Sequence, residues 1–265
     1  EERDVQIRGY KVRLPLDLFV VASANPEDYT NRGRIITPLK DRFGSQIRTH
    51  YPRRPEDEIA IMEAERTRFA TDGLRVACPD YMRELVAELT HLARRSAEIS
   101  QRSGVSVRVS ICNYENLLSN ALKRAVRTGE PEVAPRVSDL GAIVASTSGK
   151  IELETLGDAT EEKVLGKLAQ KAVLNVFNRR FAAGELDDVV AAFQDGLRVE
   201  VSDTMPSGEY ARQIAAAPAL ATAARKLGAG DPAAVAAAVE FVLEGLHLSR
   251  KLNKDVQGGR LRYRS

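Results

Sequence analysis

The feature that most constrains this chain is a change of hydrophobic period at Pro55. Before it, short apolar runs are bounded by glycine, proline and asparagine, which is typical of strands. After it, apolar residues recur every three or four positions, as they do along one face of a helix. The sequence therefore predicts a mixed, mostly α fold, with a small β-containing segment ahead of a long helical region.

Start and stop signals divide the first part of the helical region. Pro55 suits the first position of a helix, and acidic residues follow it where the helix dipole favours them. A second helix is predicted to open at Pro79. A third is predicted to begin near Ser106 and to stop at Gly129.

The second half of the chain is predicted to be almost wholly helical from residue 155 to residue 265. Two alanine-rich segments, 206–227 and 232–252, are separated by a glycine-containing break and are predicted to pack as an antiparallel pair. The basic residues 258–264 are interpreted as a solvated tail.

Residues 5–24 have the pattern of strands. Gly9 separates two short segments, which predicts a hairpin. The run Leu18–Ala22 is apolar without interruption, which predicts a strand buried on both faces, as in a parallel sheet. Asn25 follows this run, so it would lie at the carboxyl end of the strand, where open α/β sheets bind ligands.

Two interpretations of Asn25 stay open on these grounds. Its amide can both donate and accept hydrogen bonds, so it could hold a water against a phosphate. Alternatively, Asn25-Pro26 is a turn that only ends the strand. Farther along, residues 39–44 predict a short helix closed by glycine, and residues 46–51 predict another strand.

The segment Pro38-Leu39-Lys40-Asp41-Arg42-Phe43-Gly44 follows the apolar run, the Asn-Pro pair and a polar loop. This combination resembles the AAA+ ATPases, and most closely the clade of the magnesium chelatase ATPase subunit and MoxR. The resemblance implies that Asn25 is sensor 1 and that Arg42 is the arginine finger. Arg108, in the first turn of a predicted helix, matches sensor 2 by its order along the chain. A positive charge there opposes the helix dipole, so a structural role is not the obvious explanation.

The resemblance also implies a division into three regions. Residues 1–54 would be the C-terminal part of the α/β nucleotide-binding domain, with the hairpin that the clade inserts before sensor 1. Residues 55–150 would be a helical lid that carries sensor 2, and residues 151–265 a C-terminal helical region. The sequence has no Gly-x-x-x-x-Gly-Lys-Ser/Thr segment and no apolar strand ending in Asp-Glu. We therefore expect a fragment of a longer protein, which alone would bind nucleotide poorly.

The function implied by the resemblance is hydrolysis of ATP, with Mg²⁺, coupled to remodelling of a partner. Sensor 1 would orient the attacking water, and the finger would act from the neighbouring subunit of a homo-oligomeric ring, often a hexamer. Partners in this clade frequently carry a von Willebrand factor A domain. The chelatase members insert a metal into a porphyrin, but nothing in this sequence identifies a porphyrin substrate. A chaperone-like role is therefore expected rather than chelatase activity.

Composition narrows the functional classes. The formal net charge of +2 offers no global electrostatic case for nucleic acid or a membrane surface. The two cysteines cannot form a disulfide framework, and no apolar run is long enough to span a bilayer, so we expect a cytoplasmic protein. The three histidines, His50, His91 and His247, lack metal-ligand spacing, so no metal site is expected.

Three other functions stay open. A transcription activator that contacts an alternative sigma factor would need a Gly-Ala-Phe-Thr-Gly-Ala loop, which this sequence lacks. A DNA helicase of the same clade is a further possibility. The last is a non-enzymatic helical interaction module whose AAA+ remnant is inert.

Overall fold

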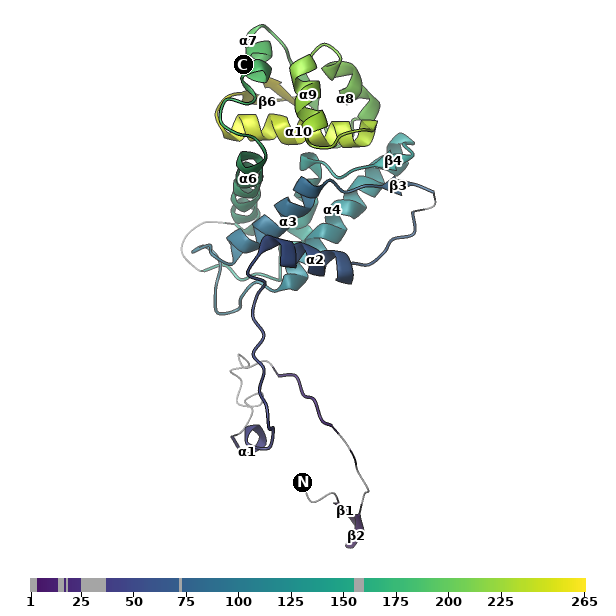
Figure 1. Ribbon diagram of the computed structural model, residues 1–265, viewed down its shortest axis with the longest axis vertical. Coiled ribbons are helices and arrows are strands. Elements are labelled where there is room, and N and C mark those ends of the chain that lie inside the picture. The colour runs from purple at the N-terminus through teal and green to yellow at the C-terminus, as the bar shows by residue number, and fades with distance from the viewer. Residues whose placement is uncertain (1–3, 14–16, 18, 25–36, 72, 155–159) are drawn as a thin grey trace. The chain divides into compact units, whose positions relative to one another are not determined.

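The chain divides into two compact units, Glu1–His50 and Tyr51–Ser265, and each is described by itself. The computed structural model is drawn as a ribbon in Figure 1. It describes residues 4–13, 17, 19–24, 37–71, 73–154 and 160–265.

The first unit contains the predicted hairpin, made of strands β1 (Asp4–Ile7) and β2 (Tyr10–Arg13). They pair antiparallel. Arg8 and Gly9 between them have φ angles of 50° and 87°. Two-residue turns with positive φ at both positions match the right-handed twist of paired strands, which explains the glycine. The hairpin prediction is therefore confirmed.

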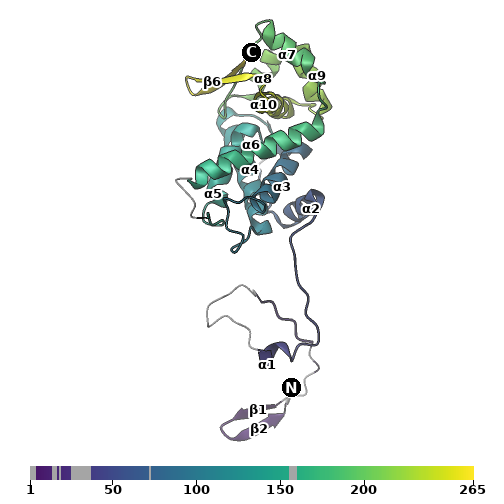
Figure 2. The same ribbon diagram turned by 90° about the vertical axis from the view of Figure 1, so that its left-hand side faces the viewer.

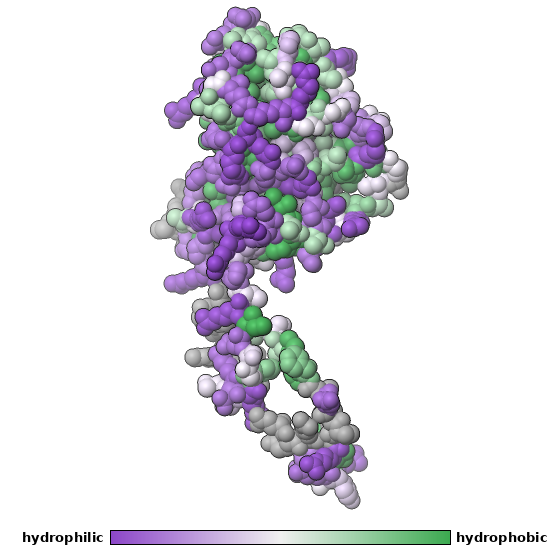
Figure 3. All heavy atoms as spheres, viewed as in Figure 1, coloured by the Kyte–Doolittle hydropathy of each residue, from purple (hydrophilic) through white to green (hydrophobic). Residues whose placement is uncertain are grey.

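The buried strand predicted over Leu18–Ala22 is wrong for the residues that are described, and Leu18 lies outside them. Residues 19–24 form no strand, and the exposed fractions of Phe19 and Val21 are 93% and 81%. Hydrophobic atoms are accordingly visible on the surface of this unit in Figure 3. An apolar strand is buried only when neighbouring strands and two covering layers are present. In the described part of this unit, the hairpin partners pair only with each other.

Two smaller predictions for the first unit also need correction. The helix expected over residues 39–44 lies earlier, as α1 (Thr37–Lys40), and a turn at Asp41 and Arg42 follows it. Residues 46–51 form no strand. A second strand, like the first, would need a sheet to join.

Helices make up most of the second unit and begin where the sequence predicted. Pro79 precedes one helix, and the Ser106 hydroxyl caps another. Gly129 ends that helix with a φ of 70°, which a residue without a side chain adopts at no steric cost. The helices are α2 (Pro55–Glu65), α3 (Asp80–Ala93), α4 (Val107–Thr128), the 3₁₀ helix η1 (Val137–Ala142), α5 (Ile143–Thr147), α6 (Glu161–Arg180), α7 (Asp187–Gln194), α8 (Ser207–Ile214), α9 (Pro218–Lys226) and α10 (Pro232–Leu248).

The alanine-rich segment 206–227 is two helices rather than one. Pro218 occupies the first position of α9, where its missing N–H costs nothing, but it could not continue α8. Both α8 and α9 contact α10.

Two small sheets complete the second unit. Strand β3 (Arg75–Val76) pairs parallel with β4 (Glu132–Val133). The second sheet is antiparallel and has the order β5-β7-β6, made of β5 (Val199–Val201), β7 (Arg260–Arg264) and β6 (Asn253–Gln257). The prediction that residues 155–265 are almost wholly helical is therefore wrong in this part.

The basic segment 258–264 is not a solvated tail, because its last five residues form the central strand β7. Arginines alternate there with Leu261 and Tyr263, which is the two-residue period of a strand with one buried face. Tyr263 is 2% exposed and belongs to the main core. This alternation is present in the sequence, but the segment was interpreted as a tail because of its positive charge.

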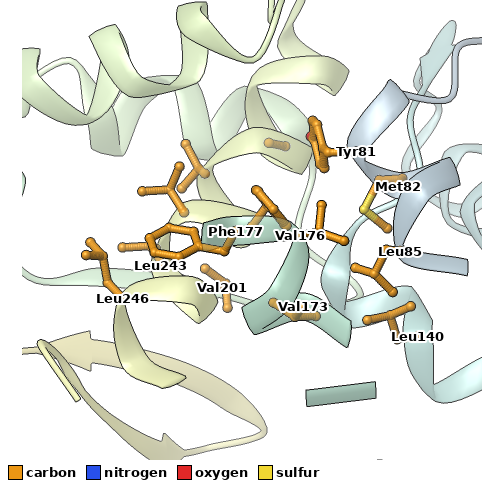
Figure 4. Packing of buried hydrophobic residues seen from close by; sticks show 14 of the residues in the cluster. Tyr81, Met82, Leu85, Leu140, Val173, Val176, Phe177, Val201, Leu243 and Leu246 are labelled. Atoms are coloured by element: carbon orange, nitrogen blue, oxygen red, sulfur yellow. The ribbon is translucent and has the colours of Figure 1, made fainter. Parts of the chain in front are cut away.

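One hydrophobic core runs through the second unit, from Met62 in α2 to Tyr263 in β7. Figure 4 shows its centre, where Phe177 lies among side chains such as Leu243 and Val201. Helix α6 contacts both α3 and α10, and the two views in Figures 1 and 2 agree on this arrangement. The predicted lid and the predicted C-terminal region therefore share buried side chains.

Helix α10 comes unusually close to α6 at Gly245. A Cβ atom added to this glycine would lie 2.0 Å from Cδ2 of the Phe177 ring. No real Cβ contact is that short, so the backbone of α10 approaches the aromatic ring only because Gly245 has no side chain. Gly166, on an exposed position of α6, has no atom within 4 Å of the same added Cβ.

We predict opposite effects for alanine at these two helical glycines. Gly245→Ala should lower the free energy of unfolding by about 1–3 kcal/mol, because the buried ring has to move. Gly166→Ala should raise it by roughly 0.5–1 kcal/mol, because alanine is the better helix former. Urea denaturation of both variants measures the difference. Equal stabilisation by both would contradict the close packing of α10 on α6.

Candidate functional site

The three residues selected from the sequence lie in different places. Asn25 is outside the described residues. Arg42 follows α1 in the first unit and is exposed. Arg108 lies in the first turn of α4, in the second unit, and is also exposed. Arg42 and Arg108 are therefore described separately, each within its own unit.

Arg108 stands at the positive end of a long helix. Its N–H donates to the Ser106 hydroxyl at 3.2 Å, and the first turn of α4 contains no acidic residue. Within the residues that the structure describes, no carboxylate pairs with its guanidinium group. Helix N-termini attract anions, and an arginine can bind two oxygens of a phosphate with its planar fork. The chemistry available here is anion binding.

A buried ion pair lies behind the first turn of α4. Glu58 of α2 is fully buried, and Arg94 at the end of α3 donates to both of its carboxylate oxygens, at 2.8 and 3.0 Å. The Ser110 hydroxyl of α4 donates to the same carboxylate. Removing one member of such a pair leaves an uncompensated buried charge, which is strongly destabilising.

His91 borders this ion pair. Its Nε2 atom lies 3.8 Å from Glu58 Oε2, and within the described part of the chain this nitrogen is buried without a hydrogen-bond partner. Burial lowers the pKa of His91, and its effect outweighs the attraction of the Glu58 carboxylate. The histidine is therefore held in its neutral form.

A second buried polar cluster joins η1 to α8 and α10. Arg136 is 1% exposed, and its guanidinium donates to Met205 O at 2.7 Å and to Ser207 Oγ at 2.6 Å. Glu240 of α10 accepts the Ser138 N–H at 2.8 Å and the hydroxyl of Tyr210. Burial raises the pKa of the Glu240 carboxyl group, although the nearby Arg136 charge opposes this.

A cavity of about 200 Å³ adjoins this second cluster and is bordered by Glu240, Glu244, Lys254 and Tyr263. Glu244 accepts hydrogen bonds from Lys254 Nζ at 2.8 Å and from the Tyr263 hydroxyl. Glu244 and Lys254 are thus satisfied by each other, and Glu240 is satisfied by Ser138 and Tyr210. The contacts of Glu244 join α10 to strands β6 and β7.

Neither buried cluster was predicted from the sequence. Glu240 and Glu244 carried a signal, because acidic residues four positions apart interrupt the otherwise apolar face of α10. Their partners lie far away in sequence and could not be assigned. Glu58 is one of the acidic residues after Pro55 that were interpreted only through the helix dipole, although its buried contact with Arg94 is the larger constraint.

Comparisons with known proteins add no relative. No family model, no curated protein and no solved structure matches the chain. Among the described residues, no group of three or more His, Cys, Asp or Glu side chains could hold a metal ion. No helix in the described part is long and apolar enough to cross a membrane.

We predict that His91 makes stability depend on pH. Its folded pKa lies below the ordinary value of 6.5, so the unfolded state takes up a proton before the folded state does. The stabilisation is complete above pH 6.5 and is lost as the pH falls through the lowered folded pKa. His91→Gln should therefore lose less stability than the natural chain between pH 7 and about pH 5.5. Urea denaturation at both pH values is the measurement, and equal losses would contradict the lowered pKa of His91.

Proposed function

We propose that this chain is the C-terminal part of an AAA+ ATPase of the magnesium chelatase/MoxR kind, which couples ATP hydrolysis to remodelling of a partner protein or a metal-insertion complex. The observation that carries the proposal is the position of Arg108. An exposed guanidinium stands at the start of α4, with a buried ion pair behind it. This arrangement suits a residue that reaches the γ-phosphate of bound ATP.

The position of Arg108 is otherwise unfavourable. A cation near a helix N-terminus opposes the dipole, at a cost of about 0.3–1 kcal/mol. Among the described residues no carboxylate offsets that cost. A bound phosphate would offset it, because it is attracted both by the guanidinium and by the positive end of the helix dipole.

The proposed reaction is phosphoryl transfer to water, with ATP and Mg²⁺ as the substrate complex. Such catalysis consists mainly of positioning and charge stabilisation. In the proposal, Asn25 orients the attacking water, and Arg108 binds the γ-phosphate from its own subunit. Arg42 stabilises the transition-state charge on the nucleotide of the neighbouring subunit.

The exposed apolar residues of the first unit support this proposal. Phe19, Val20 and Val21 are 93%, 65% and 81% exposed. Apolar surface costs about 25 cal/mol per Å² when it stays in water, so such a run is favourable only when other elements cover it. In the proposal it pairs with further strands of the nucleotide-binding domain.

The proposal includes partners and location. The ATPase would form a homo-oligomeric ring, which the action of Arg42 on a neighbour requires, and would act in the cytoplasm. A protein with a von Willebrand factor A domain is the partner that the clade suggests. Remodelling of a protein is preferred over porphyrin metallation, because no feature of the chain indicates a porphyrin.

A non-enzymatic helical interaction module is the second candidate. It is favoured by the second unit, Tyr51–Ser265, which has a hydrophobic core of its own. Such a module would fold and bind its partner without nucleotide. The two candidates therefore differ in whether Arg42 and Arg108 affect ATP turnover.

We predict different kinetic effects for the two arginines in the intact protein. Arg42→Ala should lower turnover by about 10³–10⁵ with little loss of ATP affinity, because its charge matters mainly in the transition state. Arg108→Ala should weaken both ATP affinity and turnover, because this residue contacts the bound γ-phosphate. Arg48→Ala and Arg127→Ala remove exposed arginines from the same two units and serve as controls. Unchanged turnover in both test variants would favour the interaction module.

We predict that Arg42 acts between subunits. Arg42→Ala subunits and subunits that lack the phosphate-loop lysine should each be inactive alone. When they are mixed, some interfaces combine an intact finger with an intact phosphate loop, so part of the ATPase activity should return. If mixed rings form and no activity returns, Arg42 is not a finger that acts in trans.

A further inference from the structure

Two hydrogen bonds to a single residue hold the backbone immediately before α4. Val105 is fully buried and precedes the helix-capping residue Ser106. Its carbonyl oxygen accepts a hydrogen bond from Arg94 Nε at 2.9 Å. Its N–H donates to the hydroxyl oxygen of Tyr51 at 3.0 Å. The entry of the chain into α4 is therefore fixed from two other segments.

Arg94 and Tyr51 also contact each other. The guanidinium carbon of Arg94 lies 4.3 Å from the centroid of the Tyr51 ring, which is within the range of cation–π attraction. Gly104 has a φ of 69°, and a Cβ added to it would lie 2.4 Å from Tyr51 Oη. The glycine thus lets the tyrosine hydroxyl reach the backbone of the next residue.

Arg94 is itself held in place by Glu58. The two terminal nitrogens of Arg94 donate to the two carboxylate oxygens, so each guanidinium nitrogen has an acceptor. The side chain of Arg94 is only 8% exposed. Because Ser110 donates to the same carboxylate, the residues on both sides of Arg108 are anchored to one ion pair.

We propose that Arg94 and Tyr51 are positioning residues, which fix the first turn of α4 and so direct Arg108 toward the γ-phosphate of ATP. This inference rests on the proposed function. The side chain of an exposed arginine has several rotatable bonds. The positions that its guanidinium can reach therefore depend on the position of its Cα atom. A misplacement of about 1 Å can cost up to 10²-fold in rate at such a site. Anchoring Val105 and Ser110 prevents such a displacement of the backbone that carries Arg108.

A purely structural role is the alternative, and the molecule offers a second, more exposed ion pair for comparison. Arg83 and Glu63 form a second ion pair between α3 and α2, at 3.2 Å, and each has a further ionic partner, Asp80 for Arg83 and Arg66 for Glu63. Glu63 is linked to α4 by a hydrogen bond from Tyr114, which lies beyond the first turn. Both pairs join the same two helices. Only the Arg94 pair touches the segment that carries Arg108.

The test compares Arg94→Lys with Arg83→Lys in the intact protein. Lysine keeps the positive charge, but its single ammonium cannot bond both Glu58 oxygens and the Val105 carbonyl. The measured quantity is the ratio of the affinities for a non-hydrolysable ATP analogue and for ADP, which lacks the γ-phosphate. Arg94→Lys should lower this ratio about tenfold, and Arg83→Lys should leave it unchanged. Tyr51→Phe removes only the hydroxyl and should lower the ratio about fivefold.

The double variant separates positioning from stability. If Arg94 acts only through Arg108, adding Arg94→Lys to Arg108→Ala should cause no further loss. The inference is overturned if Arg108→Ala lowers the ratio while Arg94→Lys and Tyr51→Phe do not, or if the double variant loses more than Arg108→Ala alone. If Arg108→Ala itself leaves the ratio unchanged, the proposed function fails, and the inference fails with it. If Arg94→Lys does not fold, the Tyr51→Phe variant alone tests the inference, because removal of the hydroxyl leaves the half-exposed ring in place.

Discussion

The second unit depends on the contact between Phe177 of α6 and Gly245 of α10. Helix α6 also packs on α3, and α10 contacts α8 and α9. The absence of a side chain at Gly245 therefore allows the first helices and the C-terminal elements to share one core. The buried carboxylate of Glu240 beside this core accepts hydrogen bonds from the Tyr210 hydroxyl and the Ser138 N–H. Buried carboxyl groups would otherwise be too costly at these positions.

The packing of these helices also fixes the position of the start of α4. The ion pair of Glu58 and Arg94 lies between α2 and α3 and reaches α4 through Ser110. Arg108, two residues before Ser110, is exposed. An anchored backbone that carries an exposed cation suits the proposed anion recognition, because the backbone is ordered before a ligand arrives.

The sequence predicted those features that depend on neighbouring residues. The cap at Ser106, the left-handed residue Gly129 and the hairpin turn at Gly9 are local, and each was predicted from its own residue type. Features that depend on distant partners were not. Strand β7 pairs with β5, which lies some 60 residues earlier in the chain, and the acceptor of Arg94 lies 36 residues away. The run Leu18–Ala22 has the composition of a strand, but composition does not supply the neighbours that a strand needs. The sequence predicted that Arg108 lies in the first turn of a helix, which is confirmed, and its role as sensor 2 stays a prediction. The residues that anchor its helix were not predicted.

Hydrogen exchange at the first turn of α4 tests the central claim most directly, because it reports on the place where Arg108 begins. The intact protein is compared when saturated with a non-hydrolysable ATP analogue and when saturated with ADP. If Arg108 binds the γ-phosphate and so stabilises the start of α4, the amides of residues 107–110 should exchange more slowly with the analogue than with ADP. Equal exchange in the two complexes would contradict the account.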